Sequence, residues 1–176
     1  MKFKWFNPFW FAHALMLSFG ADGKCMSGVT ACFSKAGLGI GSTAAELSIA
    51  APNGAGIDFA IDGYCYHLAD DASTASVPAA LAQQAADTDC LYLVSVNSSG
   101  TVSVTKGTEI LSADLASGAR VLEWPEPVDG KCPIGAVRVT TVAVTFTAGT
   151  TNFSASGVTD TYYDFIGGMP LAPLTS

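Results

Sequence analysis

Two segments of this chain alternate apolar and polar residues around a turn sequence, and no other feature constrains the fold as strongly. Residues 57–66 read IDFAI-DG-YCY, and an Asp-Gly pair between alternating runs is a strong signal for a β-hairpin. Residues 90–106 read CLYLVSV-NSSG-TVSVTK, which predicts a second hairpin. A chain with two such hairpins is expected to build antiparallel sheets.

The later part of the chain adds two more predicted strands. Residues 132–144 read CPIGAVRVTTVAV, and both faces of a strand with this sequence are largely apolar. Such a strand is expected in the centre of a sheet that is covered on both sides, or buried by an oligomer. Residues 158–165 are predicted to form a final strand, which the following Gly-Gly pair ends.

One helix is predicted, over residues 79–86. Pro78 suits a first helical turn, Ser76 or Thr74 can cap it, and the alanine-rich sequence that follows favours helix. Residues 110–116 are expected to form a helical turn or a loop. The predicted fold is therefore mainly β: an antiparallel β-sandwich or jelly-roll-like domain over residues 46–176 with one short helix, preceded by an extended aromatic and Gly-rich N-terminal arm over residues 1–45.

Charge is scarce along the whole chain, since only 13% of the 176 residues are charged. That share is about half of what soluble domains usually carry. It is typical of a protein whose surface is covered by partners or by a membrane. The formal net charge of −7 provides no basic surface for phosphate, so a nucleic-acid partner is not expected.

The N-terminal segment differs from everything after it. Residues 1–19 read MKFKWFNPFWFAHALMLSF, with seven Phe and Trp residues and with Lys2 and Lys4 as the only charged side chains. Aromatic side chains bury a large area at low entropic cost, so we predict an arm that docks into grooves on a neighbouring subunit. The predicted partner-binding residues are Phe3, Trp5, Phe6, Phe9, Trp10 and Phe11.

Three alternatives for the arm stay open. The arm can pack on its own domain. It can be a secretory signal peptide, or it can anchor the protein in a membrane interface. A membrane span is disfavoured, because the apolar run over residues 9–19 is shorter than the roughly 20 residues that a bilayer requires. Residues 20–42 are rich in glycine and are expected to form a flexible or extended connector.

The five cysteines are an odd number, so they cannot all pair within one chain. Buried free thiols in a reducing compartment are the favoured interpretation of Cys25, Cys32, Cys65, Cys90 and Cys132. A single disulfide, such as one between Cys25 and Cys32, remains an alternative.

No catalytic, cofactor-binding or metal-binding residues are predicted. The sequence has no nucleophile elbow and no phosphate-binding loop. His67 lies near Asp70 and Asp71 and can form a base with an orienting carboxylate, although a structural histidine is favoured. Residues 87–89, Asp-Thr-Asp, resemble a fragment of a calcium loop but are expected to form a turn. Trp124, between Glu123 and Pro125, is interpreted as a packing anchor, with sugar binding as the alternative.

Four segments of the body are similar to segments that occur in the same order in a known group of proteins. They are FAIDGYCYHLAD (59–70), CLYLVSVNSSGTVSVTKG (90–107), LEWPEPVDGKCPIGAVRV (122–139) and FTAGTTNFSASGVTDTYYDFIGGMP (146–170). In that pattern an Ile-Gly pair, here Ile134-Gly135, precedes an F-x-x-G-T-T segment and a T-x-Y-Y-D ending. The chain thereby resembles a group of uncharacterised virion structural proteins of tailed and related bacterial viruses.

The resemblance implies a structural role without enzymatic activity. The expected function is that of a capsid decoration or cement protein on the particle surface, assembled in the host cytoplasm. Its expected partners are the major capsid protein or other virion proteins, together with further copies of itself in a homotrimer or another homo-oligomer. The alternatives are a fibre or spike module that binds a receptor or glycan, for example through Tyr64, Tyr66 and Trp124, and a membrane-anchored exported β protein.

Overall fold

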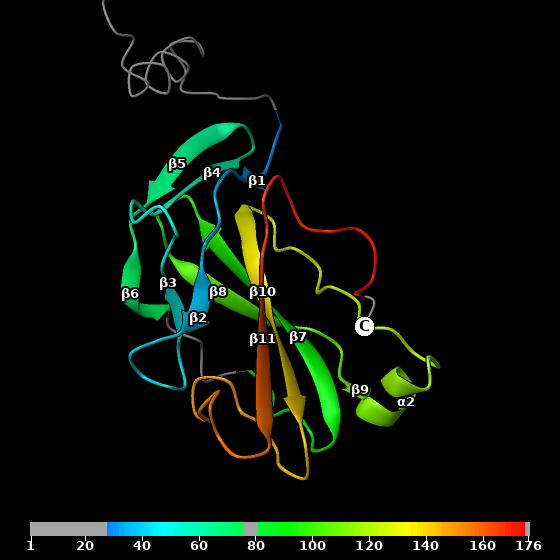
Figure 1. Ribbon diagram of the computed structural model, residues 1–176. Helices are drawn as coiled ribbons and strands as arrows, with labels where there is room; N and C mark the ends of the chain where they lie inside the picture. The colour runs from blue at the N-terminus through cyan, green and yellow to red at the C-terminus, as the bar shows by residue number, and fades with distance from the viewer. Residues whose placement is uncertain (1–27, 76–80, 175–176) are drawn as a thin grey trace, which may run out of the picture.

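A computed structural model describes residues 28–75 and 81–174 of the chain. Eleven strands and one helix form the described part of the fold (Figure 1). The strands and the helix are β1 (Ala31–Cys32), β2 (Leu38–Ile40), β3 (Leu47–Ile49), β4 (Ile57–Ile61), β5 (Tyr64–Leu68), β6 (Asp71–Ala75), β7 (Thr88–Asn97), β8 (Val102–Lys106), β9 (Ile110–Leu111), α2 (Ser112–Ala116), β10 (Lys131–Thr141) and β11 (Val158–Asp164).

The strands pair into three antiparallel sheets. The largest has the order β11-β10-β7-β8, with β9 also paired to β7. The two smaller sheets have the orders β1-β4-β5 and β2-β3-β6. In Figure 1 the sheet β2-β3-β6 lies to the left of the large sheet, and α2 and the C-terminal segment lie to its right. The mainly β, antiparallel fold with one short helix is therefore confirmed.

Both predicted hairpins are present. Strands β4 and β5 pair from Ile57 opposite Leu68 to Ile61 opposite Tyr64. Asp62 and Gly63 form the two-residue turn with positive φ angles of 52° and 86°, the backbone that an Asp-Gly pair adopts readily in a hairpin. Strands β7 and β8 likewise pair around the turn that follows Asn97.

The two faces of the large sheet are defined by the long central strands β7 and β10. On the inner face, alternate β7 side chains pack with β4 and with β2 and β3 in one large apolar cluster. Its largest fully buried members include Tyr92, Phe59, Phe146 and Phe153. On the opposite face, the outer face, Leu91 and Leu93 are also fully buried. The prediction of a central strand covered on both sides is confirmed for β10.

A β-bulge in β10 changes which side chains face inward. The register with β7 shifts between Pro133 and Gly135, so that Ile134 and Val137 both join the inner cluster. Gly135 is required at this position, because a Cβ there would lie 2.4 Å from the carbonyl oxygen of Tyr163 on β11. Simple alternation along residues 132–144 did not predict this irregularity.

The predicted helix over residues 79–86 is wrong for its described part, residues 81–86, which are not helical. Gln84 forms an isolated bridge with Phe146, with backbone hydrogen bonds of 2.7 and 3.1 Å. The Gln84 amide is buried, donates to the carbonyl oxygens of Thr88 and Val139, and accepts a 3.1 Å hydrogen bond from the Tyr92 hydroxyl. These long-range contacts override the helix propensity of the alanines. The helical turn expected within 110–116 is α2.

Residues 31–40, expected to belong to the Gly-rich connector, contribute β1 and β2 to the small sheets. Residues 1–27, which include the predicted arm residues Phe3, Trp5, Phe6, Phe9, Trp10 and Phe11, lie outside the described part of the chain. In the described part, no helix has the length and apolar character that crossing a membrane requires.

Candidate functional site: a groove on the outer face

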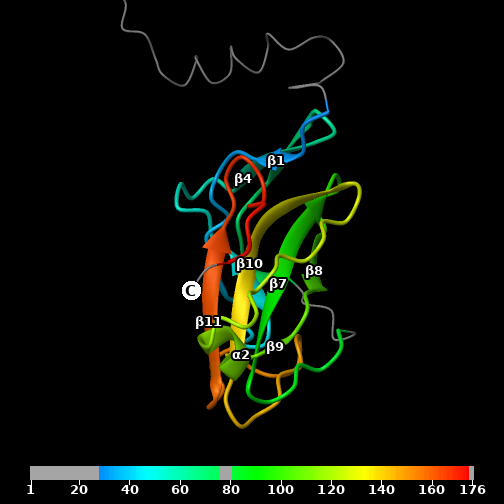
Figure 2. The same cartoon turned by 90° about the vertical axis from the view of Figure 1, so that its right-hand side faces the viewer.

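The outer face of the large sheet is covered by irregular chain. Leu91 of β7 packs with Ile110 and Leu122, and Leu93 packs with Ala136 and Phe165. Figure 2 looks onto this face, which is the side of the sheet that carries α2 and the C-terminal segment. Its cover is formed by the segments around residues 110–127 and 165–174, which are distant in sequence.

Trp124 joins these two covering segments. Its ring meets those of Tyr163 and Phe165 edge to face, with centroids 5.7 and 5.3 Å away. Its indole N–H donates a 2.8 Å hydrogen bond to the carbonyl oxygen of Ala172. The backbone N–H of Leu174 also donates a 2.8 Å hydrogen bond to the carbonyl oxygen of Leu122, which joins the same two segments. Trp124 is thus the packing anchor that the sequence predicted.

A buried carboxylate fastens α2 to the other end of the outer face. The side chain of Asp89 is 2% exposed and lies 2.7 Å from the Arg138 guanidinium, and it accepts further bonds from Ser112 and Thr140. Burial opposes its ionisation, but the hydrogen bonds from Ser112, Thr140 and Arg138, together with the Arg138 charge, hold the pKa of Asp89 below its ordinary value. This end of the face is closed by paired polar groups.

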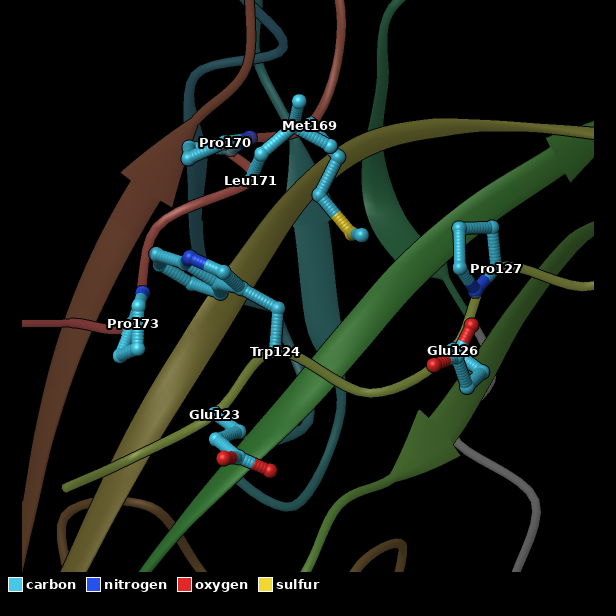
Figure 3. Close-up of a pocket in the computed structure, with 8 residues that line it drawn as sticks. All are labelled: Glu123, Trp124, Glu126, Pro127, Met169, Pro170, Leu171 and Pro173. Carbon is cyan, nitrogen blue, oxygen red and sulfur yellow. The ribbon is translucent and has the colours of Figure 1, made fainter.

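The other end of the outer face is open. A groove of about 470 Å³ lies beside Trp124, between the segment 123–127 and the C-terminal segment (Figure 3). Its walls combine apolar side chains with polar surface in about equal measure, including two carboxylates. The residues that line it are Glu123, Trp124, Glu126, Pro127, Met169, Pro170, Leu171 and Pro173.

A second hollow of about 470 Å³ continues this groove toward β1 and the β4–β5 turn. The two hollows share Pro127, Met169 and Leu171 as lining residues. The other residues of the second hollow are Thr30, Asp62, Val128, Asp129, Gly130, Lys131, Pro133 and Gly168. We call the two together the Trp124 groove.

The Trp124 groove combines exposed apolar side chains with an acidic rim. Leu171 is 98% exposed and Val128 is 39% exposed. Four carboxylates line the groove, those of Glu123, Glu126, Asp62 and Asp129, against one ammonium group, that of Lys131, which donates to Ser103. Prolines and the pinned indole shape the walls, so little conformational entropy is lost when a ligand binds.

His67 and Asp70, considered above as a base and its orienting carboxylate, do not line this groove and have different partners. His67 pairs with Asp58, Nδ1 to Oδ1 at 2.8 Å, on the surface of the β4–β5 hairpin. Asp70 instead accepts a 2.8 Å hydrogen bond from the backbone of Ala51. The alternative in which Asp70 orients His67 is therefore wrong.

The two carboxylates of the Asp-Thr-Asp sequence at residues 87–89 also have different partners. Asp87 accepts a 2.9 Å bond from the backbone of Ala143, whereas Asp89 turns to Arg138. Residues 28–75 and 81–174 contain no group of three or more His, Cys, Asp and Glu side chains placed to hold a metal ion.

Three cysteines, Cys32, Cys90 and Cys132, are free and buried. Burial raises the pKa of Cys90 and of Cys132 to about 12, so these thiols stay protonated and unreactive. The suggested disulfide between Cys25 and Cys32 is wrong, because Cys32 is free. Cys65 is disulfide-bonded, so not every cysteine is the free thiol that the sequence favoured.

The suggested aromatic surface of Tyr64, Tyr66 and Trp124 does not form one site. Tyr66 stacks on Phe59 and packs against the inner cluster, whereas Trp124 packs on the outer face. The sequence did predict an anchor at Trp124 but not the groove, because its other wall comes from residues 169–173. The two prolines of that segment, Pro170 and Pro173, were the available signal. Comparison with protein-family models, curated proteins and solved structures found no match for this chain.

Proposed function

We propose that this chain is a structural protein of a bacterial virus particle, a capsid decoration or cement protein that binds neighbouring virion subunits through its N-terminal arm. The observation that carries the proposal is the open end of the outer face. There, Leu171 and Val128 stand exposed beside a groove whose walls are partly apolar and partly polar, on an otherwise well-packed body. Exposed apolar side chains around a groove are typical of protein-binding surfaces.

The rest of the described body supports a structural role. The strands β7 and β10 are buried on both faces, and the polar groups of Gln84 and Asp89 are held by several partners each. Such a body can present an arm and a surface without itself changing shape. The sequence resemblance to virion structural proteins and the scarcity of charge favour the same role.

The test is the occupancy of particles by the full-length protein. Serine at the six predicted arm positions 3, 5, 6, 9, 10 and 11 should leave the body folded and greatly reduce the amount of protein per particle. The matched control is Phe33→Ser, which removes an exposed aromatic side chain of the body and should leave occupancy unchanged. Equal occupancy for the native and the arm variant contradicts the proposed role of the arm.

One observation favours a second candidate function, a fibre or spike module that binds glycan. The Trp124 groove has an indole ring and the carboxylates of Glu123 and Glu126 among its lining groups, and aromatic rings with nearby carboxylates are suited to stacking and hydrogen bonding with sugars (Figure 3). A glycan-binding screen with the native protein and Trp124→Phe tests it. If the native protein binds a sugar and Trp124→Phe binds it more weakly, the result supports this candidate. If the native protein binds no sugar, the candidate is excluded.

A further inference from the structure

The Trp124 groove lies at the point where the described chain begins. Thr30 lines the second hollow, two residues after Gly28. The first described residues are held there, because the carbonyl oxygen of Val29 accepts a 2.8 Å hydrogen bond from Gly63 in the β4–β5 turn. The C-terminal segment is held at the same place by a 2.7 Å bond from Gly167 to the carbonyl oxygen of Cys32. The polypeptide that precedes Gly28 thus joins the body at one end of the groove.

The chemistry of the groove complements that of residues 1–19. The groove offers apolar side chains such as Met169 and Leu171, together with four carboxylates and one ammonium group that is already hydrogen-bonded. The segment 1–19 carries seven Phe and Trp residues, two lysines and no acidic residue. Aromatic side chains that fill apolar hollows, with lysines facing carboxylates at the rim, make a matched pair of surfaces.

The chain that links the aromatic residues to Gly28 is long enough for them to reach the groove of the same molecule. Sixteen residues separate Phe11 from Gly28, and an extended chain of that length spans up to roughly 50 Å. Binding within one chain also has a high effective concentration, of millimolar order for short connections, and forfeits no translational freedom. A segment attached at the edge of the groove therefore reaches it before a segment from another molecule does.

We propose that the Trp124 groove is the docking site of residues 1–19 of the same chain, whose aromatic side chains cover Met169, Leu171 and Val128 in the isolated protein. The proposal goes beyond the binding of neighbouring subunits. It describes where the arm lies before assembly, and it makes release of the arm a step that any binding to a neighbour has to include. Release of the arm then exposes both the arm and the groove to a neighbouring subunit, so the two surfaces become available for binding at the same step.

The test is limited chymotrypsin digestion of the full-length protein, with cleavage inside residues 3–11 followed by mass spectrometry. Leu171→Asp places a negative charge in the wall of the groove at a side chain that is 98% exposed, so the fold is not at risk. It is expected to raise the rate of cleavage in the arm about tenfold, which corresponds to a loss of 1.4 kcal/mol of docking free energy. Glu123→Gln combined with Glu126→Gln should raise the rate by a smaller factor, because only the attraction to Lys2 and Lys4 is removed.

The matched control is Val142→Asp. Val142 is 60% exposed and follows the far end of β10, whereas the groove lies at the Lys131 end of that strand. This variant should digest at the native rate, and the native rate should not change when the protein is diluted a hundredfold. Equal rates for the native protein and Leu171→Asp overturn the proposal, and so does protection that disappears on dilution, since a second copy would then occupy the groove. The particle experiment above is independent of this result, so the two proposals can fail separately.

Discussion

The inner and outer faces of the large sheet are covered by different kinds of structure. The inner face of β7 and β10 packs against strands of the two small sheets, and its cluster contains fully buried rings such as Tyr92 and Phe59. The outer face packs against short irregular segments anchored by Trp124 and by the Asp89–Arg138 pair. One end of that cover is left open as the Trp124 groove.

The difference teaches where stability and where binding reside in this fold. Regular strands bury apolar side chains on every second residue, so strands supply most of the cover of the inner face, and Phe146 and Phe153 of the loop between β10 and β11 complete it. The outer face depends on single anchors between segments that lie far apart in the chain, and its cover leaves Leu171 in solvent. We expect substitutions on the inner face to act mainly on folding, and substitutions at the groove to act mainly on binding.

The largest expected effect is on the inner face. Phe59→Ala removes a ring that is 1% exposed and stacked on Tyr66, and it should lower the free energy of unfolding by about 3–5 kcal/mol. Urea unfolding at a constant m-value measures the change. Phe33→Ala is the control, because Phe33 is exposed, and it should cost less than about 1 kcal/mol. Similar losses of unfolding free energy for both variants would contradict the larger contribution expected of the inner face.

The second-largest expected loss of stability is at Gln84, the polar side chain buried against the inner face. Gln84→Ala leaves the Tyr92 hydroxyl and the carbonyl oxygens of Thr88 and Val139 without this partner, and it should cost about 2–4 kcal/mol. The neighbouring exposed residue provides the control, and Gln83→Ala should cost less than about 0.5 kcal/mol. If the two substitutions cost the same, the Gln84 network does not stabilise the fold.

The ion pair of the outer face should show a smaller and pH-dependent effect. Asp89→Asn is expected to cost about 2 kcal/mol at pH 7, because it removes a charged acceptor from three donors. The pKa of Asp89 lies below its ordinary value of 3.8 in the fold, so its contribution is present above that pH and is lost as the pH falls through the lowered value. The difference between native protein and variant should therefore shrink in acid, and an equal difference at pH 7 and at low pH would contradict the stabilising role of the charge.

The smallest expected effect is at the anchor of the groove. Trp124→Phe keeps an aromatic ring but removes the hydrogen bond to Ala172, and it should cost about 1 kcal/mol of stability. The expected local consequence is faster proteolysis within residues 170–174, measured by mass spectrometry, with the β7–β8 hairpin unaffected. Unchanged proteolysis there would show that the indole N–H does not hold the C-terminal segment.

The predictability of the fold from sequence follows the same division. The β4–β5 and β7–β8 hairpins were predicted because their alternation and their turn residues are local signals. The helix expected at 79–86 was wrong over 81–86, because the deciding contact of Gln84 is with Phe146, which is far away in sequence. Local propensity cannot register such a contact.

The candidate site was predictable only in part. The position of Trp124 beside a proline indicated an anchor, and the aromatic arm indicated a docking element. The groove itself depends on the hydrogen bond from Trp124 to Ala172, 48 residues later, and on the backbone hydrogen bond from Leu174 to Leu122. Neither leaves a pattern in the sequence, so the second wall of the site came only from the structure.

The central claim is that the open end of the outer face is completed by the arm of the same chain. The most direct measurement is the ¹³C-methyl NMR signal of Met169, which lines both hollows of the groove, in the full-length protein at low concentration. Replacing the aromatic residues at 3, 5, 6, 9, 10 and 11 by leucine should shift this signal and remove its cross-peaks to arm rings. A Met169 signal that superimposes in the native protein and the variant would contradict the claim.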